Sequence, residues 1–142
     1  MSRRALSTLV IFVALLGCGK QEELPEGPQL SLDREAMTFG GDFGNAVYIG
    51  TSKQESLILQ NKGSEPLEIQ EVMRASDPEF TLHLPEGVAG AFTIAPRQHA
   101  FIRVIFEPKE AKEYTGLLTI RSNSTDGAEK VVQLSGRGVP AP

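Results

Sequence analysis

The fold is decided by residues 102–122, which read IRVIFEPKEAKEYTGLLTIRS. Apolar side chains take alternate positions in the first part of this stretch, at Ile102, Val104 and Phe106, and again in the last part, at Leu118 and Ile120. Because successive side chains of a β-strand point to opposite faces, this alternation predicts two half-buried strands. The mixture of Glu and Lys between them predicts a solvated connection that offers polar contacts at the rim of an interface.

The same alternation recurs on both sides of this stretch. It joins Leu57 with Leu59, Phe80 with Leu82 and Leu84, and Val132 with Leu134. Chain reversals are indicated by Asn61-Lys62-Gly63, Asp77-Pro78, Glu107-Pro108 and Asp126-Gly127. No segment has the apolar period of a long helix, so residues 29–139 are expected to form an all-β sandwich.

Two local features of this pattern carry predictions of their own. Val72 breaks the parity that Leu67 shares with Ile69, which indicates a β-bulge or an early strand end. Gly63 closes a predicted turn, where we expect it to take a positive φ.

The composition is that of one globular domain. The chain has 142 residues, of which 40% are hydrophobic and 23% charged, with 14 Gly, 9 Pro, one Cys and no Trp. Its 14 basic and 18 acidic residues give a net charge of −4, and no stretch gathers Lys and Arg as nucleic-acid binding requires. We therefore expect no nucleic-acid partner, and a core that needs neither a disulfide nor a metal.

The N-terminal residues have the design of a secretory signal peptide. Arg3 and Arg4 form a positive region, and an apolar run follows from Leu9 to Leu16. This run is shorter than the roughly 18–20 residues that a transmembrane helix needs, so a spanning anchor is disfavoured.

The end of this run, Leu15-Leu16-Gly17-Cys18, resembles the lipobox of bacterial lipoproteins. The resemblance implies that the Cys18 thiol receives diacylglycerol, that the peptide is cut before Cys18 and that the new amine is acylated. Several acyl chains would anchor the protein to a membrane firmly, since a single chain binds only marginally. Gly19, rather than Asp, follows the Cys, which in enteric-type bacteria implies transport to the outer membrane. The alternative is an ordinary secreted protein with a chance Cys.

The resulting organisation has four parts. We expect a signal peptide over 1–17, the lipidated Cys18 and a flexible tether over 18–28, the domain over 29–139 and a short tail over 140–142. The tether is expected because 18–28 is polar, contains two Pro and shows no apolar period.

Four sequence blocks follow one another in the domain. They are Leu57-x-Leu59-x-Asn61-x-Gly63 with Pro66-Leu67-x-Ile69, then Ile102-x-Val104-x-Phe106-x-Pro108, then Gly116-x-Leu118-x-Ile120-x-Ser122-Asn123, then Val132-x-Leu134-x-Gly136-x-Gly138. Together they resemble the ASH/Hydin-type domain, a family that is similar to the major sperm protein domain and is also seen in bacterial choice-of-anchor D surface proteins. The resemblance implies an immunoglobulin-like antiparallel β-sandwich of about seven strands. It also implies a scaffolding, adhesion or protein-interaction role with no shared catalytic residue.

One segment departs from that family's pattern. Its members commonly place Phe-Gly shortly before the first long strand, and both Phe39-Gly40 and Phe43-Gly44 fit this description. Residues 40–45 are therefore expected to lengthen the first connection. A phosphate-binding loop is disfavoured there because the Lys-Ser/Thr of a P-loop is missing.

The residues that could carry chemistry form no recognisable constellation. We expect His83 to point outward between Leu82 and Leu84, and His99 to lie in the turn after Pro96. Neither histidine has a second ligand about three to five residues away, although the two could still meet in space. No Gly-x-Ser-x-Gly elbow and no Asp-rich calcium loop occur. We therefore expect no enzyme, no catalytic residue, no cofactor or metal, and no small-molecule substrate.

Two functions remain open. The preferred one is a cell-envelope lipoprotein whose sandwich binds another protein or a surface polymer. The alternative is a periplasmic chaperone or accessory factor that binds client strands, because PapD-like chaperones share the sandwich architecture. A deep apolar groove beside an exposed edge strand would favour the chaperone, whereas charged edges and a single apolar patch would favour the interaction module.

Overall fold

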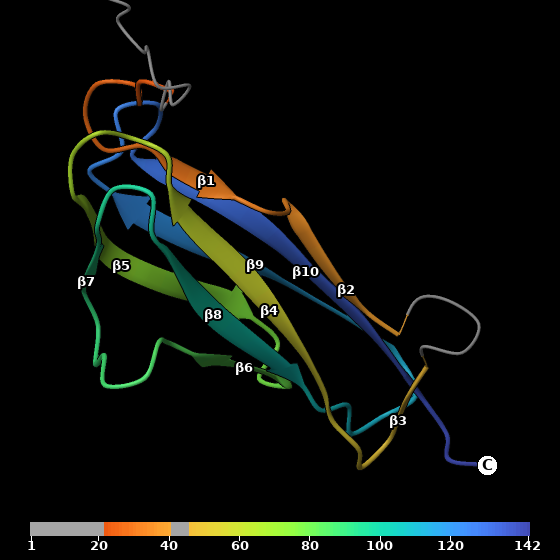
Figure 1. Cartoon of the computed structure of the whole chain (residues 1–142). Coiled ribbons are helices and arrows are strands. Elements are labelled where there is room, and N and C mark those ends of the chain that lie inside the picture. Colours follow the sequence, from red (N-terminus) through yellow and green to blue (C-terminus); the bar gives the residue numbers. More distant parts are fainter. Residues whose placement is uncertain (1–21, 41–45) are drawn as a thin grey trace, which may run out of the picture.

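Two β-sheets face each other in the structure, a computed structural model that describes residues 22–40 and 46–142 (Figure 1). The strands are β1 (Leu30–Leu32), β2 (Ala36–Phe39), β3 (Val47–Tyr48), β4 (Lys53–Asn61), β5 (Leu67–Ser76), β6 (Phe80–His83), β7 (Phe92–Ile94), β8 (His99–Phe106), β9 (Glu113–Ser122) and β10 (Glu129–Val139). The first sheet has the order β1-β4-β8-β6, and the second has the order β2-β10-β9-β5-β7, with β3 also paired to β10. The described residues contain no helix, so the predicted all-β sandwich is confirmed.

More strands are present than the alternation predicts. The additional ones are short, with three residues in β1 and in β7, four in β2 and two in β3. A segment of this length cannot display a period, and its strand conformation depends on a neighbour that is distant in sequence. The long strands can therefore be predicted from the sequence, whereas the short ones cannot.

The pairing at the outer edge of β10 is parallel, which differs from the antiparallel sandwich expected. Residues of β2 pair with Gln133–Gly136, and those of β3 pair with Gly138 and Val139. The chain changes sheets between β1 and β2, where the carboxylate of Asp33 accepts a hydrogen bond from the Ile58 amide of β4 at 2.8 Å. As a result, β10 is covered by other strands along its C-terminal half.

The predicted inward-facing residues form the core between the sheets. Leu57, Leu59, Ile102, Val104, Phe106, Leu118, Ile120, Val132 and Leu134 are each at most 2% exposed. The Phe106 ring lies 4.9 Å from that of Phe80 and 5.7 Å from that of Phe39, measured between centroids. A β-carbon added at Gly136 would lie 2.7 Å from the Phe106 ring, so this ring requires the glycine on β10.

The structure describes one of the two Phe-Gly candidates. Phe39 is fully buried at the end of β2, and Gly40 follows it with φ of 77°. Phe43-Gly44 lies outside the described residues. Phe39 is therefore a core residue, and which of the two pairs corresponds to the Phe-Gly of the family stays open.

The β-bulge predicted near Val72 is confirmed. The register between β5 and β9 shifts between Ile69 and Glu71. This extra residue restores the inward direction of Val72, which packs partly buried against the core.

The prediction of a positive φ at Gly63 is wrong. The residues with positive φ in the described chain are Gly27, Gly40, Gly50, Gly87, Gly127 and Arg97. Gly63 is needed for another reason: a β-carbon there would lie 1.9 Å from the carbonyl oxygen of Gly27. Two backbone segments meet at this point, and no side chain fits between them.

Candidate interaction surfaces

The residues predicted to carry the lipid lie outside the described part of the chain. These are Cys18 and the lipobox residues Leu15, Leu16 and Gly17. Within 22–40 and 46–142, no helix has the length and hydropathy to cross a membrane.

The described part of the predicted tether packs on the sandwich. The Ser64 amide donates hydrogen bonds to the carbonyl oxygens of Pro25 and Gly27, both at 2.9 Å. The guanidinium of Arg97 donates to the carbonyl of Glu22 at 3.3 Å. The contacts of the domain therefore begin before residue 29, where the sequence placed its boundary.

Asn61 organises this end of the sandwich. Its side chain is fully buried. The side-chain oxygen accepts hydrogen bonds from the backbone amides of Gln29 (3.3 Å) and Gly63 (2.9 Å). The side-chain nitrogen donates hydrogen bonds to the backbone carbonyls of Glu65 (2.7 Å) and Ile94 (2.9 Å). The sequence pattern placed Asn61 in a turn and did not predict this role. The alternation along β4 could have indicated that Asn61 is buried, because Asn61 occupies the next inward-facing position of this strand.

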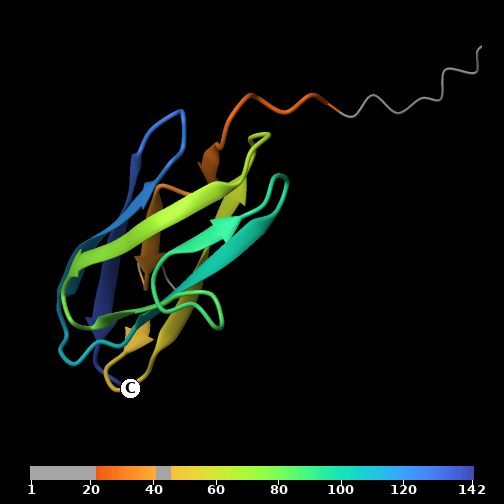
Figure 2. The same cartoon turned by 90° about the vertical axis from the view of Figure 1, so that its left-hand side faces the viewer.

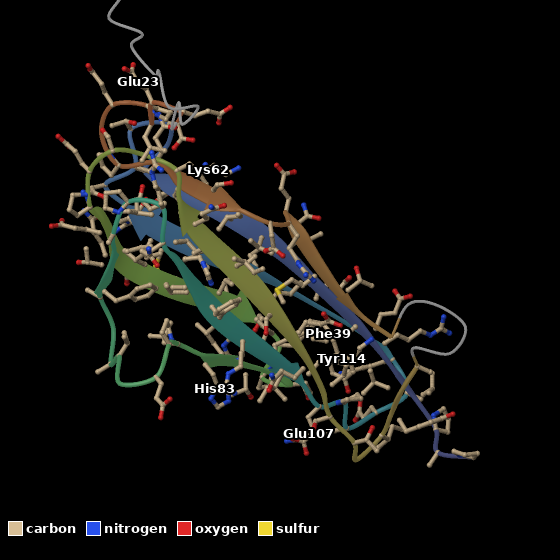
Figure 3. All side chains as sticks on the ribbon, viewed as in Figure 1. Glu23, Phe39, Lys62, His83, Glu107 and Tyr114 are labelled. Carbon is tan, nitrogen blue, oxygen red and sulfur yellow. The ribbon has the colours of Figure 1, made fainter. Side chains whose placement is uncertain are left out.

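The two histidines do not form one site. His83 is exposed, as predicted, and pairs across the sheet with Arg103 (Figure 3). His99 is also exposed but begins β8 instead of lying in the preceding turn, and its ring packs edge-on against Phe101 with centroids 5.0 Å apart. His99 and Arg103 are four residues apart on one strand, or about 13 Å. In the described part of the chain, no three His, Cys, Asp or Glu side chains group as metal ligands.

The connection between β8 and β9 is held by Tyr114, which is labelled in Figure 3. Its buried side chain places a hydroxyl oxygen that accepts hydrogen bonds from the amides of Lys109 (3.3 Å) and Glu110 (3.0 Å). A tyrosine that bonds back to the connection before its strand is a tyrosine corner of immunoglobulin-like sandwiches. The role of Tyr114 was not predicted from the sequence.

The corner carries charged groups at its surface. The Lys112 ammonium lies 3.4 Å from the Glu110 carboxylate and 5.0 Å from the centroid of the Tyr114 ring. The hydrogen bond with Glu110 is the main reason that the pKa of Lys112 is raised. The residues expected to offer rim contacts thus lie at a corner that is at the end of the sandwich opposite to Glu23 (Figures 1 and 3).

Side chains cover the outer edge of β1. The Leu30 amide donates to the Ser124 hydroxyl oxygen at 2.9 Å, and the Lys130 ammonium donates to the Leu30 carbonyl at 2.6 Å. Ser124 in turn donates to the Asp126 carboxylate. This hydrogen bond is the main cause of the lowered pKa of Asp126, and the Lys130 ammonium, 3.2 Å away, lowers it further.

The opposite side of the sandwich has a strand edge without a strand partner. Because β7 pairs only with Leu67–Ile69, residues Glu71–Ser76 of β5 pair with β9 alone in the described chain. Arg74 reaches across this opening and donates to the Phe80 carbonyl of β6. A charged side chain therefore lies across the open edge.

Apolar side chains gather on the outer face of the second sheet. Leu117 is 44% exposed and Val131 is 47% exposed. On the neighbouring strand, Ala75 pairs with Leu117. Met73 pairs with Thr119, which in turn pairs with Val131. We call Met73, Ala75, Leu117 and Val131 the outer patch. On the other sheet, Phe101 is also exposed and pairs with Ile58.

The order of strands, the tyrosine corner and the buried blocks together describe one known type of domain, and comparison with protein families agrees. The model of the family described as Cep192 domain 4 matches residues 27–139. The chain belongs to the Cep192 domain 4 family. The matched region begins at Gly27, the residue whose carbonyl contacts Ser64.

Solved structures show the same fold as this Cep192 domain 4 chain. The ASH/PapD-like domain of human CEP192 (PapD-like domain 7) is 14% identical with a TM-score of 0.63, over 99% of this chain and 100% of that one. A Porphyromonas gingivalis protein of unknown function is 14% identical with a TM-score of 0.62, over 80% of this chain and 48% of that one. The Escherichia coli chaperone DraB is 13% identical with a TM-score of 0.53, over 78% of this chain and 55% of that one. No curated protein sequence matched.

The family assignment confirms the ASH-type, immunoglobulin-like nature of the domain. It does not extend to chemistry, because the same sandwich supports many functions. What this Cep192 domain 4 chain does must be argued from its own surfaces.

Proposed function

We propose that this chain is a cell-envelope lipoprotein, anchored through lipid on Cys18, whose sandwich is a non-catalytic module that binds another protein. The anchor rests on the signal peptide and the Leu15-Leu16-Gly17-Cys18 block. The location is the envelope, with the outer membrane favoured by Gly19.

The observation that carries the binding role is the outer patch. Leu117 and Val131 are large apolar residues that the second sheet leaves exposed near its centre, on β9 and β10, whereas its third such residue, Tyr48, lies apart on the two-residue strand β3. The surrounding positions are polar, since Gln133 pairs with Leu117 and Thr119 lies beside Val131. An apolar patch with a polar rim is typical of a protein-binding surface.

The strand-lending chaperone has less support. Its client would need a long free strand edge, yet β2 and β3 cover β10 and side chains cover β1. The other edge strands of the described chain, β2, β6 and β7, have only four, four and three residues. The open edge of β5 is limited to Glu71–Ser76 and is crossed by Arg74. These edges are typical of a sandwich that avoids adding strands.

The absence of catalysis belongs to the proposal as well. His83 and His99 are exposed and lie apart on the first sheet. Replacing either histidine by Ala is expected to leave folding and the cellular role intact. Loss of the cellular role with fold and anchor retained would instead indicate catalysis or metal binding.

Crosslinking in intact cells tests the binding role, with two variants that are matched in exposure. Leu117→Glu places a charge in the outer patch and is expected to abolish crosslinking to the partner, whereas Phe101→Glu places one on the first sheet and should preserve it. Equal crosslinking by both variants would contradict binding through the outer patch. The anchor is tested separately by Cys18→Ala, which should remove the protein from the detergent phase.

A further inference from the structure

We infer that the domain stands end-on at the membrane, with residues 22–28 and the turns after β4, β7 and β9 facing the lipid headgroups. The β8–β9 corner then faces away from the membrane. This inference rests on the proposed lipidation of Cys18 and specifies how the anchored domain is presented. We call the two ends the membrane end and the distal end.

The covalent distance between the proposed lipid and the folded domain is short. Glu22 follows Cys18 by four residues, which can span at most about 14 Å. The Glu22 carbonyl is already in contact with the domain through Arg97. The membrane end therefore cannot move far from the bilayer surface.

Residues 22–28, the entering chain, are bound to the domain at several points. Ser64 holds Pro25 and Gly27 through its amide, and its hydroxyl accepts a hydrogen bond from the Gly27 amide at 3.2 Å. The Thr125 amide donates to the Pro28 carbonyl at 2.9 Å, and Pro28 is buried. These contacts join the entering chain to the turns after β4 and β9, so the domain does not swivel about residue 28.

The membrane end and the distal end of the sandwich are far apart. Strand β10 runs from Glu129 at the membrane end to Val139 at the distal end and has 11 residues. At about 3.3 Å per residue its ends are separated by roughly 30 Å. Figures 1 and 2 show the entering chain at one end and the C-terminus at the other.

The charge of the membrane end does not attract the domain to an anionic surface, so the covalent lipid alone holds this end near the bilayer. Its exposed charged residues are Glu22, Glu23, Glu26, Glu65 and Asp126 against Lys62 and Arg97. The acidic excess opposes attraction to anionic lipids. An upright domain leaves the outer patch, on the side of the sandwich, accessible to a partner.

Energy transfer to the bilayer tests this orientation in the lipidated full-length protein. The protein is reconstituted into vesicles of phosphatidylethanolamine and phosphatidylglycerol that contain an acceptor-labelled lipid. A donor dye is placed on Glu65→Cys at the membrane end or, in the matched variant, on Lys109→Cys at the distal end; both positions are exposed. Severalfold stronger transfer from residue 65 than from residue 109 is expected.

A second pair of variants tests the fixed entry of the chain. Arg97→Asn removes the contact with Glu22 while keeping a residue that tolerates the positive φ of 66° at this position. Combined with Ser64→Ala, it should reduce the difference in transfer between the two labels. Because the Ser64 amide keeps its own hydrogen bonds in this variant, an unchanged difference would overturn the role of these two side-chain contacts in fixing the entering chain. Arg97→Asn alone serves if the double variant does not fold.

The end-on orientation and the proposed lipid anchor give different results when they fail. Equal transfer from both labels, with mass spectrometry showing the lipid on Cys18, would overturn the end-on orientation and leave the anchor standing. Absence of the lipid from protein made in a lipoprotein-processing bacterium would overturn the proposed anchor, and the orientation with it.

Discussion

The hydroxyl oxygen of Ser124 accepts a hydrogen bond from the backbone amide of Leu30 at 2.9 Å, across 94 residues of sequence. Leu30 belongs to the first sheet, and Ser124 follows the last residue of β9 in the second. Both residues are buried, so water cannot replace either partner. This bond joins the two sheets at the edge where β1 has no strand neighbour on its outer side.

Replacement of Ser124 by Ala should therefore destabilise the domain. The Leu30 amide would remain buried without an acceptor, which costs about 1–3 kcal/mol in free energy of unfolding. Urea denaturation of the two proteins measures this difference. Ser52→Ala, at an exposed position, is the control and should change stability by less than about 0.5 kcal/mol.

The pKa of Asp126 predicts a pH dependence at the same edge. Its pKa is lowered in the folded state from an ordinary value of 3.8, chiefly by the Ser124 hydrogen bond and then by Lys130. The carboxylate therefore stabilises the fold above pH 3.8, and this contribution is lost as the pH falls through the folded-state pKa. Because the side chain is 45% exposed, the contribution should stay within about 1 kcal/mol.

Urea denaturation of Asp126→Asn over a pH series checks this expectation. The variant should be less stable than the wild type near neutral pH, and the two should converge in acid. A stability difference that is constant across the series would contradict the role of the charge.

Gly63→Ala should destabilise the domain through steric overlap. The new methyl group would lie 1.9 Å from the Gly27 carbonyl oxygen, so the two backbone segments must separate. Overpacking of this kind costs about 1–3 kcal/mol or more, as measured by thermal unfolding. Gly90→Ala is the matched control, since nothing lies within 4 Å of its added carbon. Equal stability of the two variants would show that the segments are not in contact.

Tyr114→Phe should loosen the β8–β9 corner while keeping the core packed. The change removes the oxygen that accepts the Lys109 and Glu110 amide bonds, at an expected cost of about 0.5–1.5 kcal/mol. Amide hydrogen exchange at these two residues should become faster. The other tyrosine, Tyr48, is 41% exposed, and Tyr48→Phe should leave both the exchange rates and the stability unchanged.

The sequence was sufficient to predict the elements whose own residues carry a period. Strands β4, β8, β9 and β10 each have eight or more residues, and their alternation identified the buried positions correctly. The bulge after Ile69 was also predictable, because an extra residue must shift the parity of an otherwise regular strand.

The remaining features depend on contacts that a linear pattern does not display. The strand β3 has two residues and exists because β10 lies beside it. The need for glycine at position 63 arises from Gly27, which the sequence assigned to a tether. Ser124 and Tyr114 are polar residues whose roles are set by backbone groups in other segments.

The parallel pairing of β2 and β3 with β10 determines the order in which the domain can be completed. Since β10 follows the other described strands in sequence, the second sheet has no partner for β2 or β3 until residues 133–139 are available. Contacts between segments so distant in sequence slow folding, because a long loop must close before they form. In a chain that emerges from the ribosome N-terminus first, β2 and β3 therefore wait for their neighbour on the second sheet until residues 133–139 have emerged.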